Sequence, residues 1–185
     1  GYTIYKNGCR ANAKDMRPYD VATYASSTNT IRVCDTRLTG YYESCTPSPT
    51  EPTSLRLLGH DFDVLPTAQS TLAKFRPGDQ ITLLLTEDNK VAGAVKPNTA
   101  GANANAIGIA TSISGTSATV ELLCGIEIKG TVDLGEAYGN RTEQIRQEEL
   151  ARMQNRLVRV TSTGKNRIGL VRLGGGVSGA LDLEK

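Results

Sequence analysis

The sequence predicts an all-β protein with one added helix, arranged as two tandem small barrel-like units related by an internal repeat. Residues 38–64 are echoed by residues 107–128, and in each copy an apolar alternating run is followed by a glycine, Gly59 or Gly125. Nineteen glycines with abundant Thr and Ser suit many short strands joined by tight turns. The 185 residues contain no Trp, two Phe and 38% apolar residues, which favours thin aliphatic cores. Repeated units present repeated surfaces, so this pattern favours a scaffold or binding module over a single catalytic centre.

The first barrel-like unit is predicted over residues 1–97. Residues 2–6 alternate as a strand ahead of Asn7-Gly8, a hairpin signal, and residues 11–16 can form one helical turn. Alternating apolar positions and turn signals predict the further strands at 20–24, 30–33, 38–43, 54–65, 80–86 and 90–95. The stretch 54–65 is predicted as a hairpin or a strand bent at Gly59.

Two segments of this first unit are not predicted to form strands. Residues 46–52 hold three prolines in seven positions, which predicts an exposed, stiff connection. Residues 67–75 have a weak helical spacing.

Residues 98–105, small and polar throughout, are predicted to be a linker before a second unit over 106–185. In this unit a helix is expected near 140–155, opened by Asn140 and Glu143 at the spacing of a reciprocal cap. Its narrow apolar stripe consists of Ile145, Leu150, Met153 and Leu157. The expected strands are 107–113, 118–123, 126–132, a hairpin 157–173 turning at Gly164 and Lys165, and a short last strand after glycines 174–176.

The single histidine, His60, is the natural starting point for a catalytic hypothesis. In a strand, His60 and Phe62 share one face while Asp61 and Asp63 share the other, so the imidazole and the carboxylates diverge. We therefore predict no catalytic residue, no metal site and no cofactor. A hydrolase centred on His60 is an alternative, and it needs Asp79 or another carboxylate brought to the imidazole by the fold.

The prolines and glycines beside two other aspartates indicate a structural role for these carboxylates. Asp20 and Asp79 each follow an Arg-Pro pair by two residues, where a carboxylate can cap a turn by accepting backbone amides. The cysteines show no Cys-x-x-Cys spacing, so ordinary reduced side chains are favoured, while a disulfide among Cys9, Cys34 and Cys45 stays open.

The segment 151–181 contains six basic residues and no acidic residue. A basic hairpin over 156–172 can hold a polyanion, although Lys and Arg also protect solvated strand edges from pairing. Nucleic acid is not expected, because no aromatic residue is interleaved to stack a base. The candidate binding residues are Arg156, Arg159, Lys165, Arg167 and Arg172.

Tyrosines offer a second binding surface, since six of the seven lie within the first 42 residues, where they can stack on sugars or close the edge of a core. The net charge of +2 specifies no partner, and no apolar run is long enough for a membrane span.

The first half of the chain resembles a known class of protein. Its strand and turn segments resemble β-rich segments of secreted Gram-positive cell-envelope proteins that carry S-layer homology modules, over residues 2–97. The segments that carry the resemblance are 3–8, 19–21, 30–31, 38–43, 52–54 and 77–85. The resemblance implies an extracellular or cell-wall location and an attachment role, with a cell-wall polymer or another envelope protein as partner.

The function expected from the sequence is therefore that of a non-enzymatic structural or attachment module of the cell envelope. The alternatives are a carbohydrate- or polyanion-binding module, which would use the basic hairpin or the tyrosines, and the hydrolase centred on His60.

Overall fold

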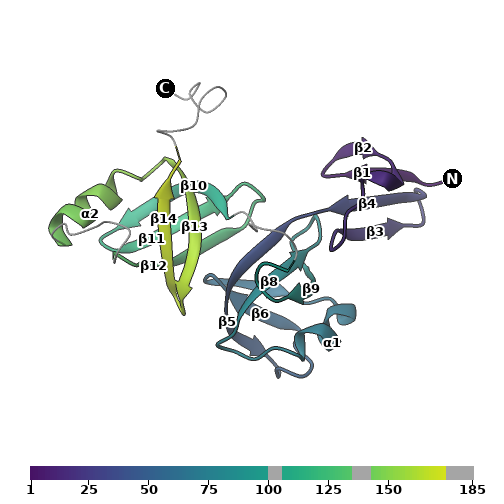
Figure 1. Ribbon diagram of the computed structural model, residues 1–185, viewed down its shortest axis with the longest axis horizontal. Helices are drawn as coiled ribbons and strands as arrows, with labels where there is room; N and C mark the ends of the chain where they lie inside the picture. Colours follow the sequence, from purple (N-terminus) through teal and green to yellow (C-terminus); the bar gives the residue numbers. More distant parts are fainter. Residues whose placement is uncertain (100–105, 135–142, 174–185) are drawn as a thin grey trace. The chain divides into compact units, whose positions relative to one another are not determined.

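The structure is a computed structural model that describes residues 1–99, 106–134 and 143–173. The chain is mostly β and falls into two compact units, one centred on strands β1–β9 and the other on β10–β14 with helix α2 (Figure 1).

The first 34 residues form a four-stranded sheet in the order β2-β1-β4-β3. Its strands are β1 (Thr3–Lys6), β2 (Cys9–Ala11), β3 (Val21–Ala25) and β4 (Thr30–Cys34). The predicted hairpins at Asn7-Gly8 and between residues 20 and 33 are present, but β1 also pairs with β4 in parallel. These residues therefore form a sheet of their own, and a single barrel-like unit over 1–97 is not confirmed. Alternation identifies strands, whereas the pairing partner depends on contacts distant in sequence.

A second, five-stranded sheet follows in the order β7-β6-β5-β8-β9. Its strands are β5 (Arg37–Thr46), β6 (Ser54–Leu57), β7 (His60–Asp63), β8 (Gln80–Leu85) and β9 (Val91–Val95), with helix α1 (Gln69–Leu72) between β7 and β8. The first strand, β5, pairs with both β6 and β8 and contains a bulge between Tyr42 and Ser44. The two outer strands meet at a parallel bridge between Val64 and Val91.

The core of this sheet is aliphatic with two aromatic residues. The largest fully buried side chains are Tyr42, Phe62, Leu38, Leu55, Leu57, Leu72, Ile81, Leu83 and Leu85. Gly59, with a φ of +71°, lies in the turn between β6 and β7, so the stretch 54–65 is a hairpin. A positive φ is accessible to glycine at little cost, which explains why a glycine occupies position 59.

The second unit is a closed barrel with the strand order β10-β11-β12-β14-β13. Its elements are β10 (Ile107–Ser114), β11 (Ser117–Leu122), β12 (Glu127–Val132), α2 (Glu143–Ala151), β13 (Leu157–Gly164) and β14 (Arg167–Arg172). Strand β10 pairs with β11 and β13, and β12 pairs with β14 in parallel. The barrel thus has five strands, with helix α2 between the third and the fourth.

The barrel is filled by aliphatic side chains, among them Ala110, Val120, Ile128, Val158, Ile168 and Leu170. Helix α2 lies beside the barrel (Figure 1). The predicted apolar stripe is correct for Leu150 and Met153, which are buried, whereas Ile145 is 44% exposed.

Three details of the predicted second unit differ or are untested. The last hairpin turns at Lys165 and Asn166, one residue later than expected, because a bulge precedes Gly164 and Asn166 takes a φ of +60°. The predicted cap at Asn140, most of the linker and the strand after residue 173 lie outside the described residues.

Candidate basic surface of the barrel

The arginines at one end of the last hairpin lie on the outside of the barrel. Arg159 is exposed between the buried residues Val158 and Val160, and its Cα partner on β14 is Val171. Arg172 is opposite Val158, and Arg156 immediately precedes β13. All three arginines are exposed and none forms an ion pair with a described residue. They are available to bind an anion.

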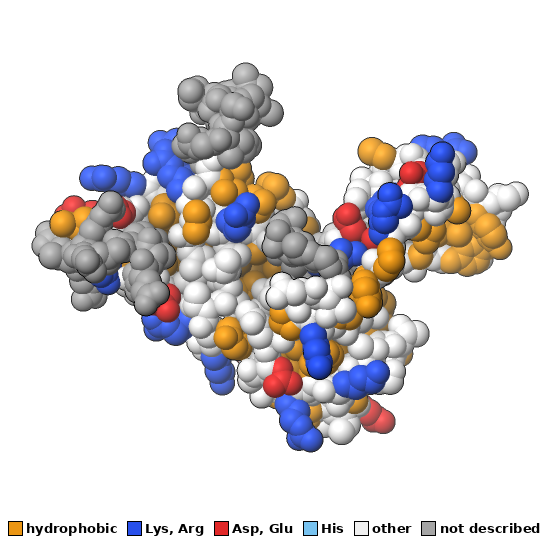
Figure 2. All heavy atoms as spheres, in the orientation of Figure 1, with side chains coloured by type: hydrophobic (Ala, Val, Ile, Leu, Met, Phe, Trp, Pro, Cys, Tyr) orange, Lys and Arg blue, Asp and Glu red, His pale blue; other side chains and the backbone are white. Residues whose placement is uncertain are grey.

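The other two candidate residues lie at the opposite end of the same hairpin. Lys165 is in the turn, and Arg167 is opposite Gly164, five positions along β13 from Arg159. At the rise of a strand this separates the two groups by about 16 Å. Arg167 also forms an ion pair with Asp133, at 3.3 Å between Nη2 and Oδ1. The five basic residues therefore form two groups, and Figure 2 shows Lys and Arg side chains scattered over the surface.

The outer face of β11 and β12 carries charges of both signs. Its outward residues include Glu121, Glu127 and Lys129, all exposed, with 3.7 Å between Lys129 Nζ and Glu127 Oε1. Two carboxylates repel a polyanion, and the described residues of this face include no aromatic side chain for base stacking. An anionic ligand thus fits the arginines of the hairpin better than this face.

The His60 ring contacts a backbone carbonyl, with 3.0 Å between Nδ1 and the oxygen of Glu127, while Asp61 and Asp79 contact other groups. On β7, Phe62 is 1% exposed while Asp61 and Asp63 are exposed, so the alternation predicted from the sequence is present. Asp61 accepts hydrogen bonds from Arg56 Nη1, at 3.1 Å to each carboxylate oxygen. Asp79 accepts the backbone N–H of Arg76 at 2.9 Å and caps a turn, as predicted.

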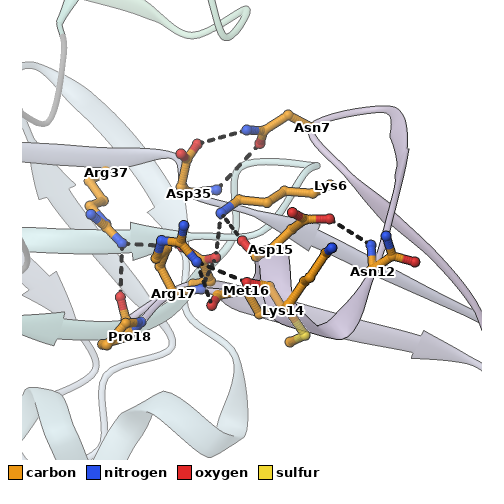
Figure 3. A network of polar contacts seen from close by, with 11 residues as sticks. Lys6, Asn7, Asn12, Lys14, Asp15, Met16, Arg17, Pro18, Asp35 and Arg37 are labelled. Carbon is orange, nitrogen blue, oxygen red and sulfur yellow. Dashed lines mark hydrogen bonds and ion pairs between the residues drawn. The ribbon is translucent and has the colours of Figure 1, made fainter.

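A polar network at the junction between the two sheets of the first unit was not found from the sequence (Figure 3). The Asp20 side chain is 2% exposed and lies 2.8 Å from Lys6 Nζ and 3.4 Å from Arg37 Nη2. It also accepts the backbone N–H of Arg17 at 2.8 Å, the turn-capping bond that was predicted. Only this last bond is local in sequence, so only it could have been anticipated.

The charges around Asp20 determine its ionisation. Burial by itself raises the pKa of the carboxyl, but the hydrogen bonds from Lys6 and Arg17 and the positive charges of Lys6 and Arg37 outweigh it. The net result is a pKa below the ordinary value. This cluster is therefore a charged structural junction.

The tyrosines of the first sheet are partly exposed. Tyr2 and Tyr24 are 59% and 53% exposed and form an edge-to-face pair with 5.4 Å between ring centroids. The Arg32 guanidinium lies 5.3 Å from the centroid of Tyr5. Rings at 87° to each other do not form one flat platform for a sugar.

The described residues contain neither a cluster of metal-binding side chains nor a disulfide. No three His, Cys, Asp or Glu side chains among them lie close enough to hold a metal ion. No disulfide links Cys9, Cys34, Cys45 or Cys124, and the buried Cys34 donates its thiol hydrogen to the carbonyl of Leu85. Neither described helix has the length and apolarity that a membrane crossing requires.

No protein-family model and no curated protein matches the sequence at a significant level.

Proposed function

We propose that this protein is a non-enzymatic structural and attachment module of a bacterial cell-envelope protein, built from two copies of one barrel-like unit. The five-stranded sheet of β5–β9 is the first copy, and the barrel of β10–β14 is the second. The observation that carries the proposal is their common strand order.

The pairings of the two copies correspond strand by strand. In each, a long first strand pairs with the second and the fourth strand, which makes β5 equivalent to β10. Each first strand contains a bulge, after Tyr42 in one and after Ala110 in the other. In each, the third and fifth strands meet in parallel, through Val64 and Val91 or through β12 and β14. In each, a helix separates the third from the fourth strand.

The two glycines of the sequence repeat support the same correspondence. Gly59 lies in the turn between the second and third strands of the first copy, with a φ of +71°. Gly125 lies in the equivalent turn of the second copy, with a φ of +92°. A duplicated unit favours a scaffold that presents repeated surfaces, here to an envelope partner.

Attachment is tested with purified Gram-positive cell walls. The protein is expected to co-sediment with the walls in a saturable manner and to release no soluble wall fragments. Failure to co-sediment contradicts attachment to the wall polymer, and release of fragments that is lost in His60→Ala supports the hydrolase hypothesis instead.

A second candidate function is binding of an anionic polymer, and it is favoured by Arg156, Arg159 and Arg172, which are exposed and form no ion pair with a described residue. Walls stripped of their phosphate-containing polymers then bind less protein. Arg159→Glu is expected to weaken binding at least several-fold. A fourfold rise in salt concentration is expected to weaken the binding of the unmodified protein by about one to two orders of magnitude, because binding through three arginines releases about three counterions. Arg10→Glu, the same charge change at an exposed residue of β2, is the control and leaves binding unchanged. Equal binding by all three proteins excludes this mode.

A further inference from the structure

One edge of the four-stranded sheet, strand β3, is open and unprotected in the described part of the chain. The barrel is closed, and in the β5–β9 sheet a single isolated bridge joins Val64, just after β7, to Val91 of β9, while the four-stranded sheet ends in β2 on one side and β3 on the other. β2 has three residues and includes the exposed Arg10. β3 has five residues, Val-Ala-Thr-Tyr-Ala, with no charge and no proline. Proteins usually protect an edge with charged residues, proline or a bulge, and β3 has none of these.

The hydrogen-bonding parity of the sheet identifies the open groups on β3. Val33 accepts the backbone N–H of Asn7 at 2.9 Å, so the peptide groups of Val33 are directed at β1. Peptide groups alternate along a strand, so those of Arg32 are directed at β3, where its partner is Thr23. The N–H and C=O groups of Ala22 and Tyr24 therefore point to the open edge. Both residues are exposed.

We propose that β3 pairs antiparallel with β3 of a second copy of this chain, about a two-fold axis at Thr23. In this register Ala22 is opposite the partner's Tyr24, and Tyr24 is opposite the partner's Ala22. Because these residues carry the open peptide groups, the register forms four N–H to O=C hydrogen bonds. A two-fold axis centred on Ala22 or on Tyr24 would form fewer hydrogen bonds with these open peptide groups. The two four-stranded sheets become one eight-stranded sheet.

The side chains of β3 suit a second copy of the same strand. A two-fold axis places each residue near its own kind, so a charged strand would repel itself, and β3 is uncharged. Thr23 meets the partner's Thr23, a favourable cross-strand pair. Ala11, Ile4, Ile31 and Tyr24 also form a row across one face of the sheet. Pairing extends this row with the partner's Ala22, and Figure 2 shows apolar side chains gathered on this part of the molecule.

Disulfide trapping tests the register. In a background with Cys9, Cys45 and Cys124 replaced by serine, Thr23→Cys places two cysteines at the axis in a non-hydrogen-bonded pair. Their Cα atoms are then about 4.5 Å apart, within the range of a disulfide. Mild oxidation is expected to give a covalent dimer. Ala22→Cys is opposite the partner's Tyr24, so its yield is expected to be several-fold lower. No dimer from Thr23→Cys, or equal yields from both variants, overturns the proposal.

Sedimentation measures the association without cross-links. The contact is small, so the unmodified protein is expected to dimerise weakly, with a dimer fraction that rises with concentration. Thr23→Lys places two like charges at the axis and is expected to give monomers. Ser27→Lys, the same charge in the exposed turn after β3, keeps the dimer. A wild-type protein that stays monomeric up to about millimolar concentration, or dimers that are unaffected by Thr23→Lys, contradict the proposed interface.

Discussion

At the scale of single residues, Asp20 is the most constrained charge of the described chain. Its carboxylate contacts Lys6 and Arg37, which are distant in sequence, and the backbone N–H of Arg17, three residues before it. Its lowered pKa means that the folded state favours the ionised form. The stability that this provides is present above the ordinary value of 3.8 and is lost as the pH falls through the lower value of the folded state.

Asp20→Asn is expected to lower the free energy of unfolding of the first sheet by about 2–4 kcal/mol at pH 7. The reason is that two cations lose their anionic partner in a largely buried place. The difference from the wild type should shrink as the pH falls below the ordinary value of 3.8, because the unfolded chain binds a proton at Asp20 there, whereas the folded chain does so only at a lower pH. Urea titrations followed by tyrosine circular dichroism at pH 7 and pH 3 provide the measurement, since four tyrosines lie in the first 24 residues.

The control for this prediction is Asp35→Asn. Asp35 is exposed and accepts one hydrogen bond from the Asn7 side chain at 3.1 Å, so its replacement should cost less than about 1 kcal/mol. A difference between wild type and Asp20→Asn that is equal at both pH values would contradict the assignment of the effect to ionisation.

At the scale of secondary-structure elements, β10 depends on a close backbone approach. A Cβ added at Gly108 would collide with the carbonyl oxygen of Glu121 and would lie 2.7 Å from the Cα of Leu122. Gly108 pairs with Leu122 on one side and Val158 on the other. Glycine therefore allows β10 to hold both neighbours at once, and this double pairing closes the barrel.

Gly108→Ala is expected to destabilise the barrel by about 2–3 kcal/mol, because backbone atoms, unlike a flexible side chain, cannot easily move aside. Gly164→Ala is the matched control in the same barrel. Its Cβ would meet only side-chain atoms of Arg167 at 3.7 Å and beyond, so a change within about 0.5 kcal/mol is expected. Thermal unfolding of both variants measures the difference. Equal midpoints would show that β10 adjusts freely at Gly108.

At the scale of the whole molecule, each unit has its own buried core. The barrel buries Val120, Ile128 and Leu170 within its closed ladder, and the first unit buries Leu55, Phe62 and Leu83. A separate core and a complete set of strand pairings are the requirements for independent folding.

A fragment of residues 106–173 is expected to unfold in one cooperative transition monitored by circular dichroism. Leu170→Ala should cost about 2–4 kcal/mol in this fragment, since Leu170 is 3% exposed. The same substitution in the full chain should shift the barrel transition by the same amount. A gradual, non-cooperative transition, or a fragment insensitive to Leu170→Ala, would show that the barrel depends on the rest of the chain.

Features that depend on neighbouring residues could be predicted from the sequence. Alternation placed Phe62 inside and Asp61 and Asp63 outside, and the hairpin at Gly59 follows from a residue that tolerates a positive φ. Asp79 caps its turn because the amide that it accepts is three residues away. These outcomes need only the local geometry of a strand or a turn.

Which strands pair and which charged residues come together depends on the folded chain. The parallel pairs β1–β4 and β12–β14 join strands that are separated by other elements, and no local pattern encodes their register. The junction at Asp20 joins Lys6 and Arg37, and the division of the basic hairpin follows from its length and from Asp133. Long-range pairing is set by the fit of whole faces and by the balance of distant charges, which become neighbours only after the chain has folded.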